Sequence, residues 1–134
     1  MIVSSIGIQA QNIDEMIVIL KQGLPADAFD KLRDRLKVSD NLLSNIVQIS
    51  KRTLNRRRQD GRLRTDESER VLRIARVYDK AFDVFESEEA VEGWLKKPAR
   101  GLGHKIPLEY SDTDLGAQEV VNLLGRIEYG VFPG

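Results

Sequence analysis

The sequence predicts an all-α fold in which an N-terminal helix-turn-helix is followed by a second, smaller helical domain. Apolar residues recur at helical spacing along most of the 134 residues. Residues that begin or end helices punctuate these segments, with Ser, Thr or Asn at the starts and Gly at the ends. Only Ile2, Ile6 and Ile8 alternate weakly, so no strand of any length is needed.

Four helices are predicted in the first half of the chain. Residues 12–22 form the first, because Asn12 and Glu15 have the spacing of a capping box and Gly23 ends the segment. The second begins near Pro25 and continues to about residue 37. Ser39 caps a short third helix, and Ser50 caps a fourth that ends at Gly61. The first three helices are predicted to bury Ile13, Met16, Ile17, Leu20, Ala28, Phe29, Leu32, Leu36, Leu42, Leu43, Ile46 and Val47.

Three helices are predicted in the second half. Thr65 starts a long one, with Asp66 and Glu67 in its favourable first turn. Ser87 caps the next, residues 101–107 form a loop, and Thr113 caps the last helix, which ends at Gly130. Residues 1–64 and 65–134 are the two predicted domains. The apolar residues expected to face the core are Val71, Leu72, Ala75, Tyr78, Phe82, Phe85, Val91, Trp94, Leu95, Leu115, Val120, Val121, Leu124 and Ile127.

Charge is balanced over the whole chain but separated along it. Residues 51–82 carry eleven basic and five acidic side chains, whereas residues 83–134 carry five basic and ten acidic ones. A basic middle followed by an acidic end predicts two different partners, because a surface that attracts phosphate is weakened by neighbouring carboxylates. Cysteine is absent, which excludes disulfides and thiolate metal sites. The apolar run 16–20 is too short to span a membrane, so we expect a cytoplasmic protein without membrane association or cofactor.

The segment 49–64 carries seven basic side chains against the single acid Asp60. A short capped helix, a tight turn and this second capped helix have the pattern of a helix-turn-helix, whose second helix enters the major groove of DNA. Leu54 is the helix's strongly apolar residue and is expected to face the core. Opposite it lie side chains of the types that reach base edges, and beside these lie residues suited to phosphate contacts. The predicted base readers are Arg52, Asn55, Arg56 and Gln59, and the predicted phosphate contacts are Ser50, Lys51, Thr53 and Arg57.

Arg58 falls nearer the buried side of the same helix and is expected to pair with an acid. The alternative to DNA binding is a solvated basic helix within a helical bundle. The turn usually holds a glycine where this chain has Gln48, so its backbone either avoids the left-handed region or is strained by roughly 1 kcal/mol.

From Leu24 onward the chain resembles the antitoxins of the MbcA/ParS/Xre group. Four stretches carry the resemblance: "ISKRTLNRRRQDGRL", "ESERVLRIARVYDKAFDVF", "EEAVEGWLKKPARGLGHKIPLEYSDTDLGAQEV" and "LLGRIEYGVFPG". The resemblance implies an Xre/Cro-like helix-turn-helix that represses the antitoxin's own operon at operator DNA. It also implies a helical second domain that binds a cognate RES-domain toxin, which consumes NAD in a pocket lined with arginines.

In this family the C-terminal end neutralises the toxin. The matching segment here follows Arg126, Glu128 and Tyr129, and consists of Gly130, Val131, Phe132, Pro133 and Gly134. Glu109 and Asp112 are further expected contacts on the body of the second domain. The tail could plug the NAD pocket through Val131, Phe132 and its carboxylate, or it could fold back on its own core.

Two other functions compete with this interpretation. The chain could be a simple dimeric helix-turn-helix regulator without a toxin partner, in which the acidic half only dimerises. It could also be an enzyme that uses Glu109, Asp112 and Asp114, although a helix start explains these acids better. His104 lies alone between Gly103 and Lys105, without partners for a metal or nucleophile site. We therefore expect a binding protein without catalytic activity that acts as a homodimer on palindromic DNA.

Overall fold

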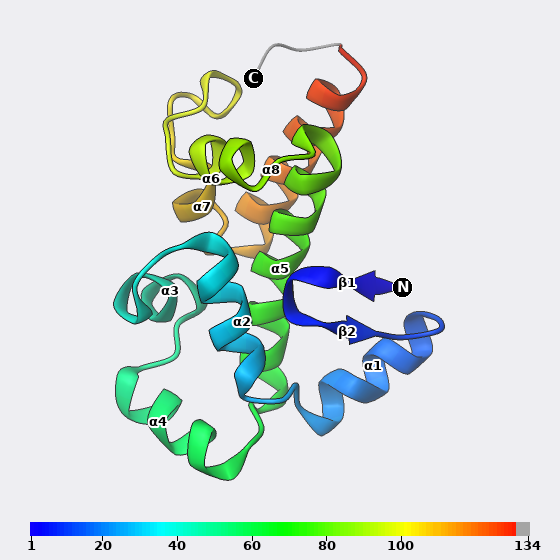
Figure 1. The fold of residues 1–134 in the computed structure, drawn as a ribbon, viewed down its shortest axis with the longest axis vertical. Helices are drawn as coiled ribbons and strands as arrows, with labels where there is room; N and C mark the ends of the chain where they lie inside the picture. Colours follow the sequence, from blue (N-terminus) through cyan, green and yellow to red (C-terminus); the bar gives the residue numbers. More distant parts are fainter. Residues whose placement is uncertain (131–134) are drawn as a thin grey trace. The chain divides into compact units, whose positions relative to one another are not determined.

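The computed structural model describes residues 1–130, and helices dominate this range (Figure 1). The all-α prediction is confirmed. The chain forms two compact units, Met1–Ala75 and Arg76–Gly134, and the division falls inside the long helix α5. The predicted toxin-neutralising tail from Val131 to Gly134 lies outside the described residues.

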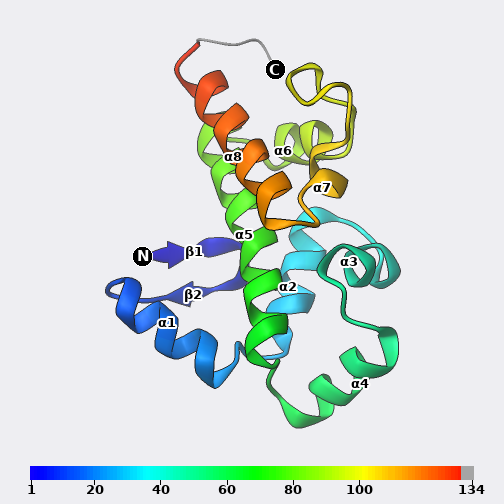
Figure 2. The same cartoon turned by 180° about the vertical axis from the view of Figure 1, so that it is seen from behind.

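The first unit contains a small hairpin, four helices and the start of a fifth (Figures 1 and 2). The strands pair antiparallel, with Ile2 opposite Gln9 and Val3 opposite Ile8. Two-residue strands are too short for alternation to reveal them, so the alternation of Ile2, Ile6 and Ile8 indicated them only weakly. The elements are β1 (Ile2–Val3), the 3₁₀ turn η1 (Ser4–Ile6), β2 (Ile8–Gln9), α1 (Ile13–Gln22), α2 (Asp27–Leu36), α3 (Asp40–Val47), α4 (Lys51–Asp60) and α5 (Thr65–Phe85).

Side-chain caps fix the helix starts in this unit. Asn12 Oδ1 accepts a hydrogen bond from the backbone N–H of Glu15 at 2.8 Å. Ser39 and Ser50 cap α3 and α4 in the same way. These caps satisfy N–H groups that have no partner inside the helix, so the predicted starts are confirmed.

The core of the first unit forms where α2, α3, α4 and α5 bury their apolar side chains. Phe29, Leu32, Leu43, Leu54 and Ile74 are almost completely buried. Helix α1 differs from the prediction, because it buries only Met16 fully.

Other apolar residues of the first unit are more exposed than predicted. Ile13 is 62% exposed, and Ile17 and Leu42 are also classed as exposed. Apolar spacing therefore overestimated how much of α1 and α3 faces the core.

The second unit consists of the end of α5, α6 (Glu88–Leu95), the 3₁₀ turn η2 (Arg100–Leu102), α7 (Pro107–Tyr110) and α8 (Asp114–Glu128). Helix α7 packs against α6 and α8, and α8 also packs against η2. The core includes Val77, Val91, Leu95, Leu108, Val120, Leu123 and Leu124. The predicted caps Ser87 and Thr113 are confirmed.

Three predictions for this unit are wrong. The expected loop 101–107 overlaps the end of η2, and α7 begins at its last residue, Pro107; both elements are too short to show helical periodicity. Phe82 is 39% exposed, since the buried side of α5 runs through Val77, Tyr78 and Ala81 instead. Leu115, in the first turn of α8, is 83% exposed.

No helix within residues 1–130 has both the length and the apolar character needed to cross a membrane.

Candidate functional site

The turn between α3 and α4 uses a strained backbone conformation. Gln48 has φ 56° and ψ 46°, in the left-handed region, and directly follows the end of α3. Ile49 is buried and Ser50 caps α4, so three residues connect the two helices. Of the two possibilities left by the missing glycine, the chain adopts the strained one, at a cost of about 1 kcal/mol.

Arg70 of α5 holds this turn in place. Its Nε donates to the carbonyl oxygen of Val47 at 2.6 Å, and its Nη2 donates to that of Gln48 at 3.3 Å. These carbonyls end α3 and have no intrahelical partner, so a cationic donor stabilises them. Sequence reasoning missed Arg70 because nothing in its own helix indicates that it reaches the turn.

Helix α4 is anchored by one apolar residue and one buried ion pair. The Leu54 side chain is completely buried, as predicted. Arg57 Nε donates to Glu67 Oε1 at 2.8 Å, and Arg57 Nη2 donates to Glu67 Oε2 at 3.2 Å. This two-point contact fixes the orientation of both side chains between α4 and α5.

The burial of Arg57 sets it apart from the other predicted DNA contacts. On a helical wheel Arg57 lies beside the exposed face, which suggested a phosphate contact. In the structure its guanidinium is engaged by Glu67, and the residue is only 8% exposed. Phosphate binding by Arg57 would require breaking this buried pair, which favours a structural role for this side chain.

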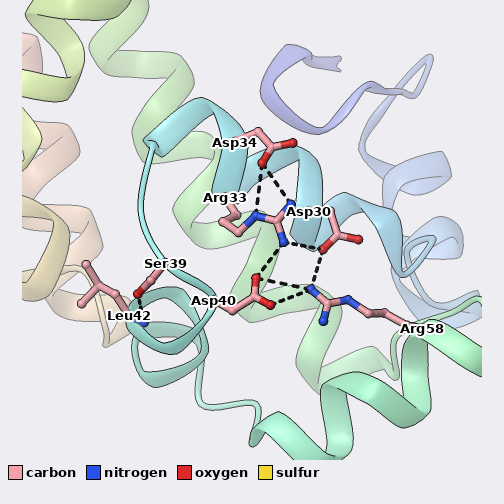
Figure 3. A network of polar contacts seen from close by, with 7 residues as sticks. All are labelled: Asp30, Arg33, Asp34, Ser39, Asp40, Leu42 and Arg58. Carbon is pink, nitrogen blue, oxygen red and sulfur yellow. Dashed lines mark hydrogen bonds and ion pairs between the residues drawn. The ribbon is translucent and has the colours of Figure 1, made fainter.

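A second charge network ties α4 to α2 and α3 (Figure 3). Arg58 Nη2 lies 2.6 Å from Asp30 Oδ1 and 3.2 Å from Asp40 Oδ2. Arg33 also contacts both aspartates and adds Asp34. In the same view Ser39 accepts the cap hydrogen bond from Leu42. The predicted pairing of Arg58 with an acid is confirmed.

These contacts shift the pKa values of the two key acids downward. Burial alone would raise the pKa of Glu67, but hydrogen bonds from Arg57 and from the Arg64 backbone N–H outweigh it and lower that pKa. The hydrogen bond from Arg33 is the largest influence on Asp40; despite some desolvation, this bond and the one from Arg58 lower its pKa. Both carboxylates are therefore held in their charged forms.

The outer face of α4 presents the remaining predicted DNA contacts to solvent. Lys51, Arg52, Asn55, Arg56 and Gln59 are exposed, and Thr53 is half-buried. Within residues 1–130, Lys51, Arg52 and Arg56 have no ion-pair partner. Ser50 is exposed, but its Oγ accepts from the Thr53 backbone N–H at 3.1 Å and donates to Thr53 Oγ1 at 2.9 Å.

The basic side chains of residues 49–64 thus include some that hold α4 in place and others that face solvent. Arg57 and Arg58 hold α4 in place, and Arg62 donates to the carbonyl oxygen of Gly23 at 2.9 Å. Lys51, Arg52 and Arg56 lie together with Asn55 and Gln59 on the solvent side of one helix. This arrangement can place forked cationic donors and amides against an anionic, hydrogen-bonding surface.

The predicted toxin contacts in the second unit lie at two ends of α8. Glu109 and Asp112 are exposed just before its N-terminus. Arg126, Glu128 and Tyr129 lie at its C-terminal end, and Gly130 follows with φ 68°. At 1.5 Å per residue, α8 separates the two groups by about 20 Å. Val131, Phe132, Pro133 and Gly134 lie outside the described residues.

The C-terminal end of α8 borders an open hollow of about 490 Å³ that sequence reasoning missed. Lys80 comes from α5, and the other lining residues come from α8 and the residue after it. Lys80 Nζ lies 2.9 Å from Glu128 Oε1. The lining residues of the hollow are Lys80, Val121, Asn122, Gly125, Arg126 and Tyr129.

The acids considered for catalysis do not form a metal-binding group in the described part of the chain. Residues 1–130 contain no group of three or more His, Asp or Glu side chains placed to hold a metal ion. Glu109, Asp112 and Asp114 are all exposed. Thr113, between the last two, caps α8 through its hydroxyl oxygen.

Comparison with known proteins matches both parts of the chain. Residues 15–76 match the family described as the antitoxin Xre-like helix-turn-helix domain. Residues 80–130 match the antitoxin Xre/MbcA/ParS C-terminal toxin-binding domain.

Three proteins named as antitoxins align with most of the chain. Proteins named Antitoxin Xre from Photorhabdus laumondii and Yersinia enterocolitica are 35% and 36% identical to the chain, over 95% of its length and 87% of theirs. A protein from Sphingobium named Prs ADP-ribosylating antitoxin is 26% identical over 88% of the chain and 80% of its own length.

Proposed function

Because the chain belongs to the Xre/MbcA/ParS family of antitoxins, we propose that it neutralises a cognate RES-domain toxin and represses its own operon. The helix-turn-helix in 1–64 binds operator DNA, and 65–134 binds the toxin. The unpaired basic face of α4 is the observation that supports DNA binding most directly.

Helix α4 has the chemistry of a major-groove reader. Arg52 and Arg56 are suited to guanine O6 and N7, and Asn55 and Gln59 to adenine N6 and N7. Lys51 and Thr53 at the N-terminal turn suit phosphates, as does the backbone near Ser50, whose hydroxyl caps the helix. The networks around Arg57 and Arg58 support this use, because a reading helix needs a fixed orientation.

The DNA hypothesis is tested with the double variant Arg52→Ala, Arg56→Ala on DNA from upstream of the chain's own gene. Each substitution should weaken binding by about 1 to 3 kcal/mol and relax sequence preference. Lys97→Ala, which removes an exposed charge from the second unit, is the control and should bind like the wild type. Full sequence-specific binding by the double variant would reject α4 as the reading helix.

We further propose that the DNA-binding form is a homodimer. One domain of this size offers too few contacts for tight specific binding at physiological salt, so two should bind half-sites about 10 bp apart or a multiple of that. Sedimentation should show a dimer at micromolar concentration. A monomer on its operator at saturating protein would contradict this proposal.

Toxin neutralisation is supported by the family match over 80–130 and by the acidic character of the second half. An acidic partner complements an arginine-lined NAD pocket of the kind that the resemblance implies. We propose that Tyr129, Gly130 and the tail Val131, Phe132, Pro133 and Gly134 cover this pocket, while Glu109, Asp112, Arg126 and Glu128 contact the toxin around it.

Co-purification with the product of the neighbouring gene is the first test of this role. A stoichiometric partner is expected for an antitoxin, whereas a simple dimeric regulator would purify alone. The second measurement is NAD consumption by that partner, with the full chain or a chain lacking Gly130 to Gly134 at equal occupancy. The truncated chain should bind DNA normally but inhibit poorly.

A point substitution refines the tail experiment. Phe132→Ala alone should weaken inhibition, since burying a phenylalanine contributes roughly 1.5 to 3 kcal/mol. Equal inhibition by the full and truncated chains would reject the tail as the inhibitory element and leave inhibition to the domain surface.

A further inference from the structure

Helix α8 contains two glycines whose surroundings differ completely. A Cβ at Gly116 would lie 1.8 Å from the carbonyl oxygen of Tyr110, so close packing inside the unit requires a glycine there. A Cβ at Gly125 would meet nothing within 4 Å. Gly125 also has no positive φ, so neither packing nor backbone conformation within the described chain requires it.

A glycine inside a helix weakens that helix relative to alanine. Gly125 lies in the last turns of α8, on the edge of the hollow that Lys80, Val121 and Asn122 also line. A missing side chain in open space allows another molecule to approach the helix backbone closely. The hollow therefore has the shape of a contact surface on the second unit.

A strip of exposed side chains runs along α8 and reaches the hollow at its C-terminal end. Leu115, Asn122, Arg126 and Tyr129 fall within about 60° of one another around α8, at 100° per residue. Tyr129 is 80% exposed at one end of this strip, and Leu115 is still more exposed at the other. Tyrosine and arginine, which both occur at the hollow end of this strip, are enriched at protein interfaces.

We propose that a segment of the toxin docks in this hollow, with its backbone or a small side chain packed directly on Gly125. The proposal rests on the toxin-binding role proposed above and specifies where that binding occurs. The match to a toxin-binding domain spans residues 80–130 and so includes every residue of the hollow, which selects the toxin over other occupants.

The lining residues define the chemistry of the docking segment. Val121 and Tyr129 offer apolar and aromatic surface to an aliphatic side chain. Lys80 also lines the hollow and is paired with Glu128. The fitting segment therefore presents a small residue to Gly125 and an aliphatic one to Val121 and Tyr129.

The test uses Gly125→Ala and Gly125→Leu, with Gly93→Ala as the matched control. Gly93 is also helical and half-buried, and a Cβ at this position would meet nothing within 4 Å. Gly93 does not line the hollow. Each full-length variant is mixed with the protein encoded beside this chain, and the dissociation constant is measured. Urea unfolding of each variant without the partner is measured in parallel.

Both alanine variants should unfold at higher urea concentration than the wild type, because alanine favours the helix. Gly125→Ala should nevertheless bind the partner about fivefold more weakly and Gly125→Leu about fiftyfold, since added atoms overpack the contact. Gly93→Ala should bind like the wild type. This combination of a more stable chain with weaker binding cannot arise from damage to the fold.

Three results would overturn the inference. Gly125→Leu could bind within twofold of the wild type, Gly93→Ala could weaken binding equally, or Gly125→Ala could destabilise the free chain. If the wild type itself does not bind the partner, the proposed function fails and the inference fails with it. If the wild type binds but Gly125→Leu binds equally well, only the location is wrong.

Discussion

Helices α4 and α8 both carry a proposed binding face, but different forces hold them in place. Helix α4 buries one fully apolar side chain, Leu54, and uses Arg57 and Arg58 in ion pairs with other elements. Helix α8 is held by apolar residues, with Val120, Leu123 and Leu124 completely buried.

This difference teaches that charge alone does not identify a binding residue. Arginine in α4 has two roles. Only the structure separates Arg57 and Arg58, which hold the helix in place, from Arg52 and Arg56 on the exposed face. In α8 the proposed contact centres on Gly125, which carries no charge and no side chain.

The largest effect is expected from removing the apolar anchor of α4. Leu54→Ala should lower the free energy of unfolding by about 2 to 5 kcal/mol, because it deletes buried methyl groups and leaves a cavity. Leu115→Ala in α8 is the matched control, and because that side chain is exposed the change should stay within about 0.5 kcal/mol. Urea denaturation measures both. Equal losses of stability in the two variants would mean that Leu54 does not anchor α4 more strongly than Leu115 anchors α8.

The next effect separates the two kinds of arginine in α4. Arg56→Ala should weaken operator binding by about 1 to 3 kcal/mol and leave unfolding unchanged. Arg58→Ala should lower the free energy of unfolding, because Asp30 and Asp40 lose a shared cation. Operator binding and urea denaturation are measured on both variants. A stability loss in Arg56→Ala would show that its exposed position does not make it dispensable for folding.

A smaller effect concerns pH and the buried partner of Arg57. The pKa of Glu67 is lower in the folded chain, so its contribution to stability is present above the ordinary carboxyl range and is lost as pH falls through the folded value. The wild type should therefore lose stability below about pH 4.5, the range of an unperturbed glutamate. Asp40 contributes in the same direction.

Glu67→Gln isolates this contribution. The variant should be less stable than the wild type at pH 7, and the gap should narrow as the pH falls toward 3. Glu69→Gln, two residues along α5 and exposed, is the control. Urea unfolding at a series of pH values measures the gap. A gap that stays constant with pH would show that Glu67 acts through packing and not through its charge.

Local signals made most helix boundaries predictable. Asn12, Ser39, Ser50, Ser87 and Thr113 each accept a hydrogen bond from the N–H three residues later, so the cap is encoded within four residues. Helix α7 was missed because a single turn has no periodicity. The exposure of Phe82 and Ile13 was missed because apolar spacing does not reveal whether a partner element lies opposite.

The candidate site was only partly predictable for the same reason. The exposed face of α4 follows from helical geometry around Leu54, which needs no knowledge of distant residues. The loss of Arg57 from that face depends on Glu67 in another helix, and the support of the turn depends on Arg70. The hollow at Gly125 depends on Lys80, more than forty residues earlier in the chain. These features depend on contacts between elements that are distant in the chain, and the pattern of a single sequence does not reveal which elements are in contact.

The smallest effect concerns the turn into α4. Gln48→Gly should raise the free energy of unfolding by about 0.5 to 1 kcal/mol, because glycine adopts the left-handed conformation at φ 56° without steric cost. Part of this gain is offset by the greater freedom of glycine in the unfolded chain. Operator affinity should not change, since Arg70 bonds the backbone carbonyls of Val47 and Gln48 and not the Gln48 side chain. Gln48→Ala is the matched control, because it removes the same side chain but keeps the strain. If Gln48→Gly instead weakens operator binding while Gln48→Ala does not, the strained residue itself fixes the angle between α3 and α4, and the anchoring attributed to Arg70 is insufficient.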